Sequence, residues 1–285
     1  MIPVKPFLTY DQQIEYLVNA GLLIEDKERA KNILSTLNYY RFINAYSLGL
    51  YEAPKEKKKY IAGTTFQQIY DLYLFDGQLR HILSELLEEF EIIFRTKLAY
   101  HIGLKYGALG YLDSTLFENK YYHDDFIKSF KREQEQQDKS PIVKHHKEKY
   151  DCQMPIWAAV EILSFGTISK LYSNMKTSDR IEIAKELGTS YTYLNSWLRS
   201  FVEVRNICAH YGRLYNKFLL FPPKLYGNMS FANNRIFAVI YILKRFVDDS
   251  VWDSLYARLK ATVENHYAVN LGKIGFPVNW DKLLM

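Results

Sequence analysis

Residues 65–107 read TFQQIYDLYLFDGQLRHILSELLEEFEIIFRTKLAYHIGLKYG, with apolar side chains at intervals of three and four. This spacing places the apolar residues on one face of an α-helix. The stretch is much longer than an average helix, so it predicts either one very long helix or two helices joined near Asp76 and Gly77. Strand-like alternation is scarce elsewhere, and we therefore expect an all-α fold.

Helix start and stop signals divide the rest of the chain into further helices. Thr9 and Gln12 form the pattern of a capping box for a helix that runs to Gly21, and Asp26 is placed to begin the next helix. We expect residues 1–62 to form an N-terminal helical segment packed on a domain of residues 63–285. The other predicted helices cover residues 126–137, 178–187, 231–247 and 252–263, with one more beginning at Pro155 and one running from Ser190 to a stop at Gly212.

Composition limits the class of protein. The 285 residues are 48% hydrophobic and 16% aromatic, which is enough for a sizeable core. A net charge of +5 permits binding to a polyanion but does not require it. The lysines at positions 55, 57, 58 and 59, and the stretch from Lys144 to Lys149, are interpreted as solvated faces.

The sequence contains no motif for several other types of site. Cys152 and Cys208 match no zinc-ligand spacing, and neither a glycine-rich phosphate loop nor a nucleophile elbow occurs. The sequence also lacks a run of 18 apolar residues and the apolar core of a signal peptide. We therefore expect a cytoplasmic protein with free thiols, no membrane association, no metal and no cofactor.

The candidate site is the segment Arg205-Asn206-Ile207-Cys208-Ala209-His210, near the end of the helix predicted from Ser190. Arginine binds phosphate oxygens through its planar fork, and histidine exchanges a proton near neutral pH. A second pair of this kind is Arg95 with His101. With 12 Arg and 7 His in the chain, about one such pair is expected by chance, so spacing alone does not identify a site.

The context of these pairs resembles a known family. The Arg-Asn-x-x-Ala-His segment is similar to the motif of the HEPN superfamily, and the whole chain resembles the Abi-like proteins of bacterial abortive infection, the AbiD and AbiF group. The resemblance covers most of the chain, in order. It is carried by the stretches from Lys5 to Ile14, Asn38 to Arg41, Phe75 to Arg80, Arg95 to His101, Pro155 to Gly166, Arg205 to His210 and Gly275 to Trp280.

The resemblance implies an all-α, HEPN-like helical bundle with additional N-terminal and C-terminal helices. It also implies a role in phage defence or in a toxin–antitoxin system, with RNA as substrate and with a neighbouring partner, such as a small RNA, that restrains the activity. The related effectors of type VI CRISPR systems carry two HEPN sites. No DNA partner is expected.

The residues themselves allow RNA cleavage without a metal. The 2′-OH of RNA is an internal nucleophile, and a catalyst needs a base, an acid and positive charge on the transition state. His210 suits the proton transfers and Arg205 suits the phosphate, while Asn206 is placed to hydrogen-bond either the imidazole or a phosphate oxygen. Expected products are a 2′,3′-cyclic phosphate and a 5′-hydroxyl.

Positions 205 and 210 lie about 140° apart around a helix, so they flank a groove and a second element must complete the site. One histidine also cannot easily act as acid and base in a single step. A second Arg–His pair therefore faces the first, either Arg95 with His101 of the same chain or the same pair of a second copy in a homodimer. The alternative function is a non-catalytic module that holds a structured small RNA.

Overall fold

The structure, a computed structural model, describes residues 6–52, 59–227, 229 and 231–285. Within these ranges every regular element is a helix, and extended backbone forms only isolated bridges such as Leu23 with Thr65. The predicted all-α class is confirmed. The lysines at positions 55, 57 and 58 and residue Lys5 lie outside the described residues.

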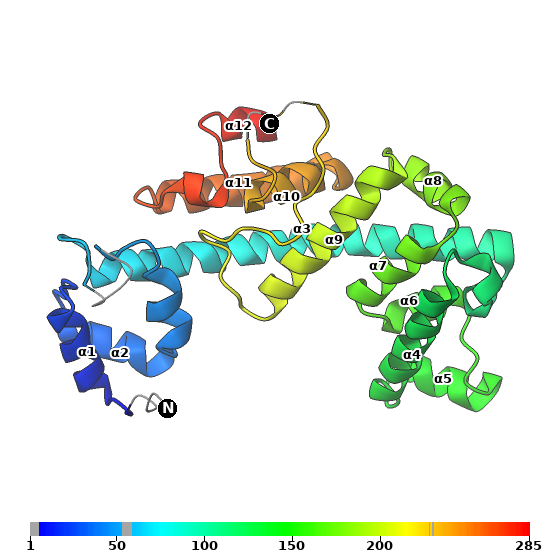
Figure 1. Cartoon of the computed structure of the whole chain (residues 1–285), viewed down its shortest axis with the longest axis horizontal. Helices are drawn as coiled ribbons and strands as arrows, with labels where there is room; N and C mark the ends of the chain where they lie inside the picture. Colours follow the sequence, from blue (N-terminus) through cyan, green and yellow to red (C-terminus); the bar gives the residue numbers. More distant parts are fainter. Residues whose placement is uncertain (1–5, 53–58, 228, 230) are drawn as a thin grey trace.

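The helix α3 (Phe66–Tyr106) runs through the molecule as its long axis (Figure 1). Its 41 residues form one continuous helix, which is the first of the two predicted arrangements. Thr65 and Gln68 close a capping box at its start, and Gly107 ends it with a positive φ of 78°. The helix continues through Asp76 and Gly77, and the side chain of Asp76 is buried.

The remaining elements pack at successive positions along α3 (Figure 1). The N-terminal helices lie near its beginning, α10 and α11 lie along its middle, and α4 to α8 surround its end, while α9 crosses it. Their bounds are α1 Tyr10–Asn19, α2 Lys27–Thr36, the π-helical turn η1 Tyr40–Asn44, the 3-10 turns η2 Gly110–Leu112 and η3 Ser114–Leu116, α4 Lys120–Gln136, α5 Pro141–Tyr150, α6 Ile156–Ile162, α7 Phe165–Asn174, α8 Thr177–Glu186, α9 Tyr191–Ala209, α10 Ile236–Leu243, η4 Lys244–Phe246, α11 Asp249–Asn265, η5 Leu271–Ile274 and α12 Trp280–Leu284.

The helix starts predicted at Thr9, Asp26 and Thr65 are confirmed by their caps, whereas α4 and α11 begin six and three residues before the predicted positions 126 and 252. The side chain of Thr9 accepts from the N–H of Gln12, and Asp26 caps α2. The charged run from Lys144 to Lys149 belongs to α5, a helix that the sequence analysis did not predict, although Ser140 caps it and Pro141 occupies its first turn. The helix predicted over 231–247 begins only at Ile236, after Arg235 as its cap residue.

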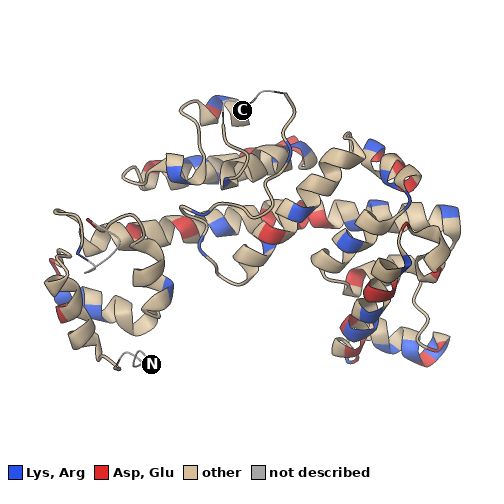
Figure 2. Cartoon of the chain, viewed as in Figure 1, with Lys and Arg blue, Asp and Glu red and all other residues tan. Residues whose placement is uncertain are grey.

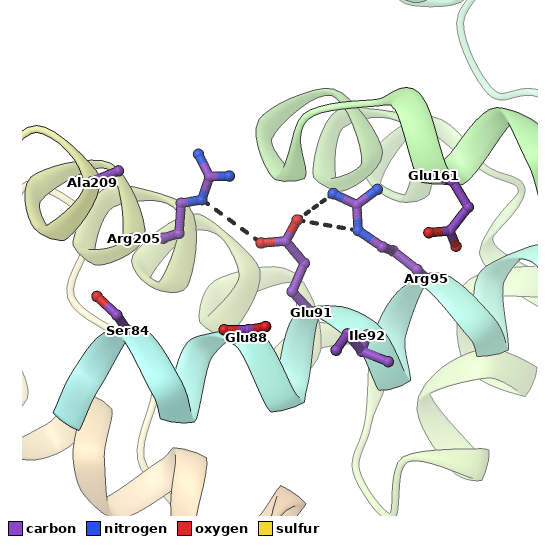
Figure 3. A pocket seen from close by; sticks show the side chains of 8 residues that line it. All are labelled: Ser84, Glu88, Glu91, Ile92, Arg95, Glu161, Arg205 and Ala209. Atoms are coloured by element: carbon purple, nitrogen blue, oxygen red, sulfur yellow. Dashed lines mark hydrogen bonds and ion pairs between the residues drawn. The ribbon is translucent and has the colours of Figure 1, made fainter. Parts of the chain in front are cut away.

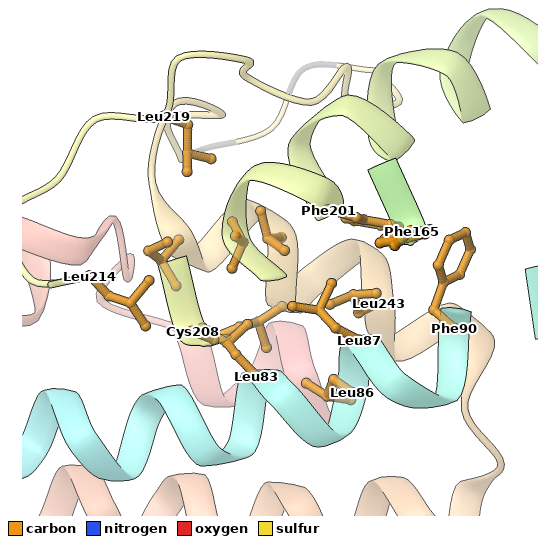
Figure 4. Packing of buried hydrophobic residues seen from close by; sticks show 14 of the residues in the cluster. Leu83, Leu86, Leu87, Phe90, Phe165, Phe201, Cys208, Leu214, Leu219 and Leu243 are labelled. Atoms are coloured by element: carbon orange, nitrogen blue, oxygen red, sulfur yellow. The ribbon is translucent and has the colours of Figure 1, made fainter. Parts of the chain in front are cut away.

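The core forms where α9 and the helices after it cover one face of α3. Leu83, Leu87 and Phe90 of α3 contact side chains from the other elements (Figure 4). The ring of Phe90 lies edge-on to Phe201 of α9, with centroids 4.8 Å apart. This packing fixes α9 against α3, and it therefore fixes the side chains that α9 presents on its outer face.

Charge is mixed over the surface of the molecule. Basic and acidic residues are interspersed along α3, α4 and α9 (Figure 2). Of the helices in the described ranges, none combines the length and the apolar character needed to cross a bilayer.

Candidate functional site

The helix α9 places Arg205, Asn206 and His210 on its solvent side. Its other side is buried, because Phe201, Val204 and Cys208 pack into the core. Arg205 is half-buried, while Asn206 and His210 are exposed. Among the described residues the side chains of Asn206 and His210 have no hydrogen-bonding partner, and only the backbone carbonyl of Asn206 accepts from the N–H of His210, at 3.0 Å. The amide of Asn206 therefore does not hold the imidazole in this state.

The end of α9 differs from the prediction by three residues. The helix ends at Ala209, His210 is its cap residue, and Tyr211 takes the left-handed conformation with φ 55°. Gly212 then donates its N–H to Ile207 O at 2.7 Å. A Cβ at position 212 would lie 3.0 Å from Ile207 Cγ2 and 3.2 Å from Ile207 O, so glycine is needed here for close approach rather than as the residue that ends the helix.

The chain after His210 is anchored by a buried carboxylate. Asp76 of α3, which is fully buried, accepts hydrogen bonds from the backbone N–H groups of Leu214 at 3.0 Å and Tyr215 at 2.7 Å. It also accepts from Tyr46 Oη at 2.6 Å and forms an ion pair with Arg80 Nη1 at 2.7 Å. Arg80 in turn donates to the carbonyl of Gly212 at 3.2 Å. Burial raises the pKa of Asp76, and these donors act in the opposite direction. The network fixes the backbone on the C-terminal side of His210.

Arg95 and Arg205 meet around one carboxylate. Glu91 lies between them and points toward both guanidinium groups (Figure 3). Its Oε1 accepts from two nitrogens of Arg95, of which Nε lies at 3.1 Å, and its Oε2 lies 3.7 Å from Arg205 Nε. Arg95 also donates to the carbonyl of Val160, so this guanidinium is largely occupied by protein groups. The two Nη nitrogens of Arg205 have no partner among the described residues and remain available.

Two hollows open beside this arginine pair. The first, of about 380 Å³, is lined by both arginines, Glu91 and Ala209, the residue that precedes His210 (Figure 3). Because Glu88 and Glu161 line it as well, carboxylates outnumber guanidinium groups there. The second, of about 460 Å³, adds Arg132 of α4 to Arg95 and Arg205, with Glu133 and Glu161 as its acidic residues. Guanidinium groups outnumber carboxylates by one among the residues that line the second hollow, but Glu91 between Arg95 and Arg205 balances this excess. The groups there that can bind a phosphate are the guanidinium of Arg132 and the Nη nitrogens of Arg205.

His101 does not join this arrangement. Its side chain is buried against α8, where Nε2 lies 3.0 Å from Asp179 Oδ1 and Nδ1 lies 3.7 Å from Glu182 Oε2. Ala209 shares a pocket with Ser84, and His101 is 17 residues further along α3 than Ser84, which corresponds to about 25 Å. The structure therefore brings Arg95 to Arg205 but leaves His101 far from His210 within one chain.

His101 belongs to a cluster of charged side chains at the contact between α8 and the end of α3. In the described part of the chain, His101, Asp179 and Glu182 are the group whose donor atoms are close enough for a metal ion, all within 4.8 Å of one another. Lys105 Nζ, however, lies 2.7 Å from Asp179 Oδ1 and 3.1 Å from Glu182 Oε2. An ammonium group thus already supplies the positive charge, and the cluster joins α8 to the end of α3.

Replacement of Asp179 by asparagine is expected to lower the free energy of unfolding by about 2–3 kcal/mol at pH 7, because Lys105, His101 and Tyr106 lose a charged acceptor. Burial alone would raise the pKa of Asp179, but hydrogen bonds from Lys105, His101 and Tyr106 outweigh it and lower this pKa. The stabilisation is therefore present above pH about 4 and is lost as the pH falls through the lower folded-state pKa. Urea unfolding of both proteins at pH 7 and at pH 3 measures the difference, and an equal difference at both pH values would contradict this account.

Two residues of this region were not selected from the sequence. Glu91 precedes Arg95 by four positions. This is the spacing of an ion pair on one helix face, and it could have predicted the contact between the two side chains from the sequence. Arg132 lies in the charged helix α4, and nothing in its local sequence sets it apart from its neighbour Lys131. Only the tertiary packing, with α4 against α7 and α7 against α9, places Arg132 at the same hollow as Arg205.

Comparison with known proteins gives a family for this arrangement. No curated protein and no solved structure matches the chain. A family model described as Abi-like protein matches residues 32–216, which is 185 of the 285 residues. The match includes η1, the whole of α3, the segment Arg205 to His210, and Leu214 and Tyr215, which Asp76 holds. The chain therefore belongs to the Abi-like protein family.

Proposed function

We propose that this protein is a metal-independent endoribonuclease that acts as an effector of abortive infection in the bacterial cytoplasm. Membership of the Abi-like family supports the biological role. The observation that carries the chemistry is the meeting of Arg95 and Arg205 at one pocket edge, with an exposed, unpartnered His210 next to Ala209 of the same pocket. The resemblance of the segment Arg205 to His210 to the HEPN motif supports the same proposal.

In this mechanism each residue has a separate task. His210 takes the proton of the 2′-OH or gives one to the 5′-oxygen, since both of its ring nitrogens are free for such a transfer. The Nη edge of Arg205 binds the phosphate and stabilises the charge that develops on it. Glu91, held by Arg95, orients the guanidinium of Arg205. Asn206 binds a phosphate oxygen.

A single His210 supplies only one of the two proton transfers. Because His101 is buried about 25 Å away along α3, the second imidazole comes from His210 of a second copy of this chain. The working enzyme is thus a homodimer whose two α9 ends face each other. A non-catalytic RNA-holding module is the alternative, and Arg205 and Arg132 favour RNA binding in either case.

The test is incubation of the purified protein with RNA in EDTA. Cleavage is expected to persist, and the products are expected to carry 2′,3′-cyclic phosphate and 5′-hydroxyl ends, because the nucleophile is the RNA's own 2′-OH. RNA with 2′-O-methyl groups at the cleaved positions should remain intact. Equal cleavage of the methylated RNA would exclude this mechanism, while RNA binding without any cleavage would favour the non-catalytic module.

Replacement of Arg132 by glutamine should weaken RNA binding at all sequences and lower the slope of log K against log salt by about 1, since one phosphate contact is lost. Fluorescence anisotropy titrations at several salt concentrations measure both quantities. The matched control is Lys131→Gln, which removes the same charge from the neighbouring exposed position of α4 but not from the hollow. Identical slopes for the two variants would place the phosphate elsewhere.

A further inference from the structure

A further pocket lies near the N-terminal end of the molecule, and five of its eleven lining residues are tyrosines. Its volume is about 720 Å³, within the usual range for small-ligand pockets. Five tyrosines contributed by α1, η1 and the segments around residues 51 and 60 line it, together with Asn44. They are Tyr16, Tyr39, Tyr40, Tyr51 and Tyr60. None of the described residues that line the pocket is charged.

The tyrosines form a fixed floor and an open rim. On the floor, Tyr60 is buried, its hydroxyl lies 2.9 Å from Ser47 Oγ, and its ring centroid lies 4.7 Å from that of Tyr51. At the rim, Tyr16 is 45% exposed and Tyr40 is 72% exposed. A ring that enters this pocket lies among tyrosine side chains, with the side-chain amides of Gln13 and Asn44 also in the lining.

Two adjacent residues, Tyr40 and Arg41, connect the rim of this pocket to the candidate active site. Tyr40 at the rim donates its backbone N–H to the side chain of Asn38 at 2.9 Å. The next residue, Arg41, donates through Nη1 to the carbonyl of Tyr211 at 2.8 Å, and its Cζ lies 5.8 Å from the centroid of the Tyr211 ring. Tyr211 follows His210 directly and is 70% exposed. Exposed aromatic rings and an arginine thus lead from His210 to the pocket.

We propose that this pocket binds an unpaired base of single-stranded RNA, on the 3′ or 5′ side of the nucleotide at His210. The inference rests on the proposed ribonuclease function and extends it to the class of substrate. An uncharged pocket with aromatic walls suits a planar, neutral base, whereas Arg41 between the two sites suits the phosphate that joins the nucleotides. A base inside a duplex remains stacked and paired, so it cannot enter such a pocket.

The probe is a short single-stranded RNA that contains 5-iodouridine, bound to the His210→Ala protein so that it is not cut. Replacement of Tyr40 or Tyr16 by alanine is expected to weaken its binding roughly five- to one-hundred-fold, the range found when a stacking ring is removed. Ultraviolet crosslinking followed by mass spectrometry should place the iodouridine on peptides that contain Tyr16, Tyr39 or Tyr40. Both substituted side chains are exposed at the rim, so the fold is retained, which circular dichroism verifies.

The matched control is Tyr267→Ala, which removes a ring that is 91% exposed and outside the pocket. It should bind as the parent does, and a duplex of the same sequence should bind the Tyr40 variant and the parent equally. If the parent binds RNA and both rim variants bind it with unchanged affinity, or if the crosslinks fall elsewhere, the base-binding pocket is excluded while the ribonuclease proposal stands. If the wild-type protein neither binds nor cuts RNA, the proposed function fails first and the pocket assignment fails with it.

Discussion

Replacement of His210 by alanine is expected to lower the rate of RNA cleavage by about 10²–10⁴-fold, the usual contribution of a general acid or base. The imidazole is exposed at the end of α9 and has no partner among the described residues, so its removal leaves the packing of the helix unchanged. Binding of RNA should change little, because the phosphate contacts come from the arginines. Initial rates at saturating RNA, with affinity measured separately, distinguish the two effects.

The matched control for this experiment is His145→Ala, which removes an exposed histidine from α5, outside both arginine-lined hollows. It should cleave RNA at the wild-type rate. A second comparison concerns Arg205. The variant Arg205→Lys keeps the charge but loses the planar fork, so it should retain binding better than cleavage. Wild-type cleavage by His210→Ala would remove this residue from the mechanism.

Replacement of Asp76 by alanine is expected to lower the free energy of unfolding by about 3–5 kcal/mol, a large part of the stability of a typical domain. The change leaves the buried guanidinium of Arg80 without its carboxylate and the N–H groups of Leu214 and Tyr215 without an acceptor. Tyr46 loses its hydrogen bond as well. Urea unfolding followed by circular dichroism measures the loss. If the alanine variant does not fold, Asp76→Asn keeps one acceptor oxygen and permits the same comparison.

The control is Asp71→Asn on the same helix, where the carboxylate accepts, within the described part of the chain, only from the side chain of Gln67. Its effect should stay within about 0.5 kcal/mol, as at most surface positions. An equally small effect at Asp76 would mean that the four hydrogen bonds do not stabilise the folded state. Asp76→Asn should also reduce RNA cleavage under conditions where the protein is folded, because the backbone after His210 is then held less firmly.

The Asp76 network gives a structural role to segments that lie far from the candidate site in the sequence. The segment Phe75 to Arg80 supplies the carboxylate and the guanidinium that hold residues 212–215. The segment Asn38 to Arg41 supplies the hydrogen bond from Arg41 to the carbonyl of Tyr211. Both segments lie far from Arg205 in sequence, yet both fix the end of α9 in space.

The sequence by itself determined the helical class, the length of α3 within the choice of one helix or two, and several helix starts. These features depend on local periodicity and on caps such as Thr9, Asp26 and Thr65, which act over a few residues. It also singled out Arg205 and His210, since an arginine and a histidine near one helix end are visible as a local pattern.

Only the tertiary structure decided which residues share the pocket. Arg95 and His101 are six residues apart, but the packing of α3 between α9 and α8 turns Arg95 toward Glu91 and Arg205 and turns His101 toward Asp179. Arg132 joins Arg205 only because α4 folds back beside the same hollow. Contacts of this kind depend on the directions in which whole helices pack. These directions are set by buried contacts between residues more than a hundred positions apart, such as Phe90 with Phe201.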